Sequence, residues 1–253
     1  MFIQGVYKTL HGVTKLYCCG MCSKDDTCKS VNYQRVAKEC KLVSMPLSAW
    51  IPTYDTNWDV YTKIGWTLLF RGTRGIGGDI YTAWTNGDSV TEDDVTCMTT
   101  DVTSCNQHYR NPIVNMWSSL ATTQIKVKYV LYKSEGEVAY IIFNGTGSNA
   151  TSWFSQENVF ESTWDNLKND TYNYFSASGY NNTRRFYANR NFGGCDVDTA
   201  YTVTIATQFI NCDFDVPETV PQFLYSTSAT YGYPNQMIGM DRADVMAIFV
   251  MIG

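Results

Sequence analysis

The sequence contains few basic residues and no long apolar segment. Lys and Arg total 19 against 24 Asp and Glu among 253 residues, so the formal net charge is −5 and the isoelectric point is near 5.0. Nucleic acid requires a basic face opposite its phosphates, and an anionic membrane attracts polybasic segments, so neither is an expected partner. The longest apolar run, residues 245–252, is much shorter than the roughly 20 residues of a membrane-spanning helix. We therefore predict no membrane span and interpret this run as a buried terminal strand.

Residues that commonly carry catalysis are also scarce. The 2 histidines are His11 and His108, and no Gly-x-Ser-x-Gly nucleophile motif is present. The glycine-rich segment 71–79 lacks the Gly-Lys-Ser/Thr ending of a phosphate-binding loop and is predicted to form a turn. We interpret His108 as a structural histidine and expect no required cofactor. A secreted enzyme that uses His108 or scattered carboxylates is the alternative.

Cysteine and aromatic residues, by contrast, are abundant. The chain has 9 Cys, 18 Tyr, 12 Phe and 7 Trp. The close spacing of the cysteines favours disulfides and an oxidising compartment, so we predict a secreted protein. Residues 1–15 contain no apolar leader segment, and we expect the leader to be missing from this chain. Four glycosylation sequons are compatible with a secreted glycoprotein: Asn144, Asn149, Asn169 and Asn181.

Five of the cysteines lie within residues 18–40: Cys18, Cys19, Cys22, Cys28 and Cys40. Residues 13–24 form a plausible short helix, on which Cys18 and Cys22 share one face. Cys19 is rotated by about 100° from Cys18 and points elsewhere. The short turn after Cys22 favours a bond to Cys28, which leaves Cys18 for Cys40, although the spacing also permits other pairings.

The pattern Cys-x3-Cys-x5-Cys-x11-Cys, with "CKSVNY" and "ECKLVSM", closely resembles the PAN/apple domain. "FIQGVYKTLHG" is similar to the first strand of that family and "NWDVYTK" to its closing strand, so the resemblance covers residues 1–63. It implies a helix on a curled antiparallel sheet, the nested pairs Cys18–Cys40 and Cys22–Cys28, and binding to proteins or carbohydrates. The outer cysteine pair of longer apple domains is missing, and Cys19 lies outside the pattern. We expect Cys19 to be a small buried apolar residue or, alternatively, an intermolecular bridge within a disulfide-linked oligomer.

Residues 64–253 contain a succession of short aromatic and β-branched runs, including a hairpin over residues 125–145. We predict a mainly β protein in which the small α+β module is followed by an antiparallel β-sandwich domain with short helices. The helical segments are "DDVTCMTTD", "IVNMWSSLAT" and "STWDNLKND". The stretches "WTLLFRGTRGIGGDIYTAW", "HYRNP", "WFSQENV" and "RRFYANRNFGGC" resemble an uncharacterised domain of secreted marine-invertebrate proteins, from molluscs and lancelets. That resemblance implies a compartment and no mechanism.

The last four cysteines fit the second region. Cys97 and Cys105 can close a small loop, and Cys195 can pair with Cys212 across two predicted strands. The second bond would bring together the motifs "CDVD" and "CDFD", whose carboxylates are Asp196, Asp198, Asp213 and Asp215. Four carboxylates this close would repel one another unless solvated or neutralised, and Ca²⁺ is the extracellular cation for an all-oxygen site. Two separate solvated strand faces are the other interpretation.

The densest group of aromatic and polar residues lies within residues 172–191. Exposed rings beside Asn, Asp and Arg are typical of sugar-binding sites, so we predict ligand contacts there from Tyr172, Tyr174, Tyr180, Arg184, Arg185 and Tyr187. The predicted function is that of a secreted recognition or adhesion protein, which binds glycans or other extracellular proteins as a lectin does. A secreted enzyme and a disulfide-linked structural matrix component are the alternatives.

Overall fold

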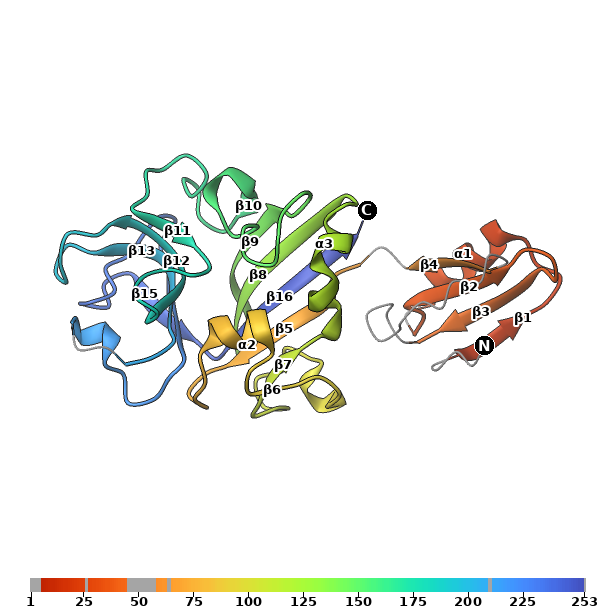
Figure 1. The fold of residues 1–253 in the computed structure, drawn as a ribbon, viewed down its shortest axis with the longest axis horizontal. Helices are drawn as coiled ribbons and strands as arrows, with labels where there is room; N and C mark the ends of the chain where they lie inside the picture. Colours follow the sequence, from red (N-terminus) through yellow and green to blue (C-terminus); the bar gives the residue numbers. More distant parts are fainter. Residues whose placement is uncertain (1–5, 26, 45–57, 63–64, 209–210, 253) are drawn as a thin grey trace. The chain divides into compact units, whose positions relative to one another are not determined.

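The computed structural model describes residues 6–25, 27–44, 58–62, 65–208 and 211–252. The chain divides into two compact units, Met1–Thr67 and Leu68–Gly253 (Figure 1). Each unit has its own apolar core. The two units are therefore described separately.

The first unit is a four-stranded antiparallel sheet with one helix. The strand order is β1-β3-β2-β4, with bounds β1 Val6–Leu10, β2 Ser30–Gln34, β3 Glu39–Val43 and β4 Trp58–Thr62. Helix α1, Lys15–Ser23, packs on β2 and β3. It begins after Thr14, whose hydroxyl accepts a hydrogen bond from the backbone N–H of Tyr17 and so satisfies a free donor of the first turn.

The larger sheet of the second unit has seven strands in the order β10-β9-β8-β16-β5-β7-β6. Their bounds are β5 Thr67–Thr73, β6 Val90–Thr91, β7 His108–Arg110, β8 Ile125–Lys133, β9 Gly136–Asn144, β10 Val159–Ser162 and β16 Val245–Ile252. Strands β8, β9 and β16 pair antiparallel over long stretches, whereas β6 and β7 run parallel. The predicted hairpin and the predicted terminal strand form the centre of this sheet.

The smaller sheet is a meander of five antiparallel strands, β11 to β15 in sequential order. Their bounds are β11 Tyr174–Ser176, β12 Arg184–Asn191, β13 Thr199–Ile205, β14 Gln222–Ser226 and β15 Met240–Ala243. The two sheets share one core: the ring of Tyr129 on β8 stacks on Phe186 of β12 at 5.9 Å, and its hydroxyl lies 3.0 Å from that of Thr202 on β13. The predicted mainly β, antiparallel architecture is confirmed.

The helical elements of the second unit are short. They are α2 Ile80–Asn86, α3 Trp117–Leu120 and the 3-10 helices η2 Val95–Cys97, η3 Pro112–Met116, η4 Gln156–Asn158 and η5 Asp213–Asp215. The first two predicted segments thus contain only one or two helical turns, and the third forms turns instead of a helix. Helix α2 was not predicted, although Asp79 caps its start and Gly87, in the left-handed region, ends it.

Three tryptophans attach the helices to the sandwich core. Trp84 of α2 meets Trp117 of α3 edge to face at 5.7 Å, and both pack against Trp153. All three indoles are buried. Among the helices of the described residues, none has the length and hydropathy required to cross a bilayer.

Candidate functional site

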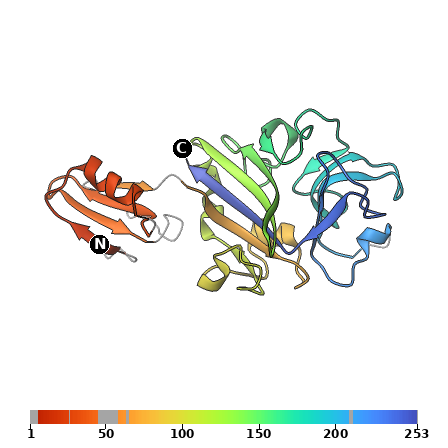
Figure 2. The same cartoon turned by 180° about the vertical axis from the view of Figure 1, so that it is seen from behind.

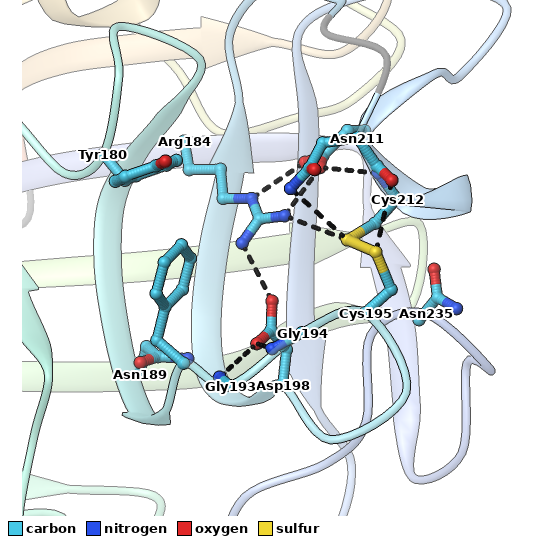
Figure 3. A network of polar contacts seen from close by, with 12 residues as sticks. Tyr180, Arg184, Asn189, Gly193, Gly194, Cys195, Asp198, Asn211, Cys212 and Asn235 are labelled. Atoms are coloured by element: carbon cyan, nitrogen blue, oxygen red, sulfur yellow. Dashed lines mark hydrogen bonds and ion pairs between the residues drawn. A yellow bond between two sulfur atoms is a disulfide. The ribbon is translucent and has the colours of Figure 1, made fainter.

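The disulfide Cys195–Cys212 lies beside a buried arginine, Arg184, at the start of β12 (Figure 3). The guanidinium donates two hydrogen bonds to Asp215, from Nε to Oδ1 at 2.9 Å and from Nη2 to Oδ2 at 2.6 Å. Its Nη1 donates to Oδ2 of Asp198 at 3.1 Å. One cation therefore neutralises one carboxylate from each of the two Cys-Asp-x-Asp motifs.

Backbone groups complete this network. Asp198 Oδ1 accepts from the backbone N–H groups of Gly193 and Gly194, at 3.0 and 3.1 Å, as Figure 3 shows. Burial by itself lowers the pKa of Arg184, but the hydrogen bond and charge of Asp215 outweigh it and raise that pKa above its usual value. The exposed fraction of the arginine side chain is only 1%, so this network is a structural link inside the fold.

The predicted calcium ligands are not gathered at one position. Asp196 is exposed and its Oδ1 accepts a hydrogen bond from Nε2 of Gln236. Asp213 is also exposed, and its backbone N–H donates to the side-chain Oδ1 of Asn235 at 2.9 Å. Asp198 and Asp215 already have Arg184 as their counter-charge. The described residues include no group of three or more His, Cys, Asp or Glu that could hold a metal ion. The calcium hypothesis assumed four uncompensated carboxylates, and the fold does not provide them.

Most of the side chains predicted to contact a ligand are internal. Arg184, Arg185 and Tyr187 are buried. The rings of Tyr174 and Tyr180 are partly buried and pack on Phe192. The reason is the place of β12 inside the smaller sheet: apolar clusters cover both of its faces, with Phe186 in one and Tyr187 in the other. These five residues therefore cannot form the exposed aromatic surface that the prediction required.

Arg185 fixes helix α2 to the smaller sheet. Its Nη2 donates to Asp79 Oδ2 at 2.9 Å, its Nη1 donates to the carbonyl of Ser178 at 2.8 Å, and its Cζ lies 4.5 Å from the ring centre of Tyr81. Asp79 uses its other oxygen to cap α2 through the backbone N–H of Tyr81. One carboxylate thus starts the helix and positions it.

Tyr172 belongs to a different, partly exposed group, which we call the Arg190 cluster: Asp170, Tyr172, Arg190, Tyr201 and Tyr231. The Nε of Arg190 lies 3.2 Å from Asp170 Oδ1, and its Nη1 donates to the hydroxyl of Tyr231 at 2.5 Å. The hydroxyl of Tyr201 donates to Asp170 Oδ2 at 2.5 Å. Burial and this hydrogen bond raise the pKa of Tyr201. The rings of Tyr172 and Tyr201 are 5.8 Å apart.

The outer edge of the Arg190 cluster reaches solvent. The arginine side chain is 42% exposed, and Asp170 is 10% exposed. The exposed ring of Tyr233 lies 6.2 Å from that of Tyr231. Sequence reasoning found Tyr172 but missed the other four members, because the residues come from β12, β13 and two loops that the sequence does not place side by side.

His108 is a structural histidine, as the sequence indicated. Its Nδ1 accepts from the backbone N–H of Thr73 at 3.1 Å, and its Nε2 contacts the carbonyl of Gly77 at 2.9 Å, which defines a neutral ring with the proton on Nε2. Burial lowers the pKa of His108. With both nitrogens occupied and the ring 1% exposed, His108 is not available as a general base.

Two nested disulfides hold the first unit together, Cys18–Cys40 and Cys22–Cys28. All four of these cysteines are buried between α1 and the sheet, together with Val31 and Leu42. Residues 1–64 match the family model of the PAN domain. The first unit is a PAN domain. No curated protein and no solved structure matches the chain.

The PAN domain indicates a class of proteins in which such domains occur. Such domains occur in extracellular proteins that adhere to or bind other proteins, and domains with several disulfides are typical of that compartment. The remaining two predicted bonds, Cys97–Cys105 and Cys195–Cys212, are also present, so all four predicted disulfides are confirmed. The side chain of Cys19 lies outside the described residues. The resemblance of the second unit to marine-invertebrate proteins stays a prediction.

All four sequon asparagines lie in the second unit, and each is exposed: Asn144, Asn149, Asn169 and Asn181. Asn144 ends β9, and Asn169 directly precedes Asp170 of the Arg190 cluster. The fold therefore leaves room for a glycan at each position.

Proposed function

We propose that this chain is a secreted recognition protein whose second unit binds extracellular carbohydrate at the Arg190 cluster. One observation carries the proposal: Arg190 is held in a fixed position by Asp170 and Tyr231 while 42% of its side chain faces solvent. An arginine immobilised in this way loses little further conformational entropy when a ligand binds. The PAN domain supports an extracellular recognition role for the whole chain.

The chemistry of the cluster suits a sugar. The guanidinium of Arg190 offers planar donors to ring and hydroxyl oxygens, and a carboxylate on an acidic sugar would match it in charge. The exposed ring of Tyr233 provides an apolar face for the C–H side of a pyranose. Asp170 keeps Arg190 oriented, because its Oδ1 holds Nε and its Oδ2 is bound by Tyr201.

A glycan array with the full chain, followed by calorimetry on the best ligand, tests the proposal. Arg190→Ala should weaken binding by about 1–3 kcal/mol, which is the cost of losing charge-assisted hydrogen bonds. Arg74→Ala is the matched control, because Arg74 is 39% exposed and forms a similar ion pair with Asp244 at 2.9 Å. Equal affinities of the Arg190 and Arg74 variants would refute the site. An empty array together with capture of a protein from extracellular matrix would refute the carbohydrate ligand.

A further inference from the structure

Part of the outer face of the larger sheet carries partly exposed apolar side chains, toward β9, β10 and the end of β16, whereas Val130, Val245 and Ala247 on the same face are fully buried. Alternate residues of β8, β9 and β16 point into the core, such as Val127, Ile141 and Ile248. The residues between them form the opposite face, which we call the outer sheet face: Lys126, Lys128, Ile142, Phe249 and Met251, with Phe160 of β10 at its edge. In Figure 2 this side of strands β8, β9 and β16 is seen with no helix in front of it.

Lysine stems cover only part of this face. Lys126 places its Nζ 4.0 Å from the ring centre of Phe160, and Lys128 pairs with Glu137 at 2.6 Å. Phe160 nevertheless remains 56% exposed. It lies on β10, the edge strand of the sheet, where an exposed apolar residue favours association with a second chain.

The sequon at Asn144 lies on the same face. Asn144 pairs in register with Lys126 on β8, and it follows Ile142 by two residues, so all three share the outer sheet face. Strand β10 is the neighbour of β9 on the other side, with Val159 opposite Phe143. Neighbouring strands are about 4.8 Å apart, so the first one or two sugars on Asn144 would reach both Lys126 and Phe160.

The local geometry of the sequon presents the amide nitrogen to solvent. Asn144 Oδ1 accepts from the backbone N–H of Thr146 at 3.2 Å, and Thr146 Oγ1 accepts from the N–H of Ile125 at 3.2 Å. The middle residue must be small, because a Cβ on Gly145 would lie 2.7 Å from Val127 Cγ2. The amide oxygen is therefore used inside the turn, while Nδ2, the atom that glycosylation modifies, has no hydrogen-bond partner in the described part of the chain.

We propose that Asn144 carries an N-linked glycan whose first sugars pack on Phe160 and Ile142 and thereby cover the outer sheet face. A pyranose has an apolar C–H side that suits an aromatic ring, and its hydroxyl groups keep the covered surface soluble. The inference requires secretion but is independent of the carbohydrate ligand proposed above, since the Arg190 cluster contains neither Asn144 nor Phe160.

The test begins with site occupancy. The full chain is secreted from a eukaryotic host behind a host leader, and peptides are mapped by mass spectrometry after enzymatic deglycosylation, which converts an occupied Asn to Asp. We expect this conversion at Asn144. Thr146→Ser should keep the glycan, and Asn144→Gln should lose it. An unmodified Asn144 in a chain that is glycosylated at another sequon would overturn the proposal.

The covering role is tested by deglycosylation of the folded wild-type protein, with two variants for comparison. Enzymatic removal of the glycan at Asn144 should increase the binding of an apolar fluorescent dye and shift sedimentation from monomer toward larger species. Glycan removal from the Asn144→Gln variant, whose other sites are unchanged, is the control and should produce neither shift. Phe160→Ser should suppress both effects in deglycosylated protein. If deglycosylation at Asn144 leaves dye binding and sedimentation unchanged, the glycan does not cover this face.

Discussion

Replacement of Arg184 by methionine should strongly destabilise the second unit. The guanidinium is 1% exposed, and the carboxylates of Asp198 and Asp215 are 2% and 0% exposed. Methionine fills much of the volume but leaves both carboxylates inside the protein without a counter-charge. Loss of one partner of a buried ion pair costs about 3–5 kcal/mol, so we expect a loss of about 4 kcal/mol in the free energy of unfolding. This is a large share of the stability of an ordinary domain.

Urea denaturation under oxidising conditions measures this loss. Arg74→Met is the control: its ion pair with Asp244 is solvent-exposed, and such pairs contribute about 0–1 kcal/mol. Adding Asp198→Asn and Asp215→Asn to Arg184→Met should recover much of the stability, because the buried negative charges are then gone. If Arg184→Met costs no more than Arg74→Met, the network does not contribute as its geometry implies.

Three further predictions concern pH, a disulfide and a helix start. Because burial lowers the pKa of His108, the unfolded chain binds a proton that the folded chain does not. The stability contributed by the neutral ring is therefore present above about pH 6.5 and is lost as the pH falls below it. Between about pH 7.5 and 5.5, the melting temperature should decrease less for His108→Gln than for the wild type. Replacing Cys18 and Cys40 by alanine opens a loop with a sequence separation of 22 and should cost the PAN domain about 3 kcal/mol, which appears as faster proteolysis of residues 1–67. Asp79→Ala removes both the cap of α2 and the partner of Arg185, and should cost at least the roughly 1 kcal/mol of a lost cap in urea denaturation.

Each of these predictions has an outcome that contradicts it. Equal pH dependence in wild type and His108→Gln would assign the acid sensitivity to other groups. Proteolysis of the PAN domain at an unchanged rate would mean that the Cys22–Cys28 bond and the apolar core suffice. For α2, Asp79→Asn keeps a capping oxygen but loses the charge, so equal losses for the Asn and Ala variants would show that the cap is unimportant.

Short sequence patterns were sufficient to predict secondary structure that depends on neighbouring residues. The alternation of residues 125–145 predicted the β8–β9 hairpin. The spacing of Cys18 and Cys22 predicted that they share one helix face, from which they bond to Cys40 on β3 and to Cys28, which lies just before β2. The pattern for α2 was weaker, because Tyr, Thr and Trp have only moderate helix propensity and the helix is 7 residues long. The residues in the sequence that indicate this helix are its N-terminal cap, Asp79, and its C-terminal cap, Gly87.

The mainly β class was predictable from the sequence because periodicity is a local property, and the PAN domain with its two nested disulfides was predictable from a resemblance in cysteine spacing. Which polar residues face solvent became clear from the three-dimensional fold alone. Arg184 and Arg190 lie six positions apart on one strand, yet Arg184 is buried against Asp215, 31 residues away, while Arg190 is exposed beside Tyr231, 41 residues away. Register shifts between β12 and β13 break the simple alternation that would relate the two arginines. The burial of a charged side chain thus depends on partners that the fold brings from distant segments. For this reason the sequence pointed to Arg184 as a ligand contact, whereas the proposal from the structure names Arg190.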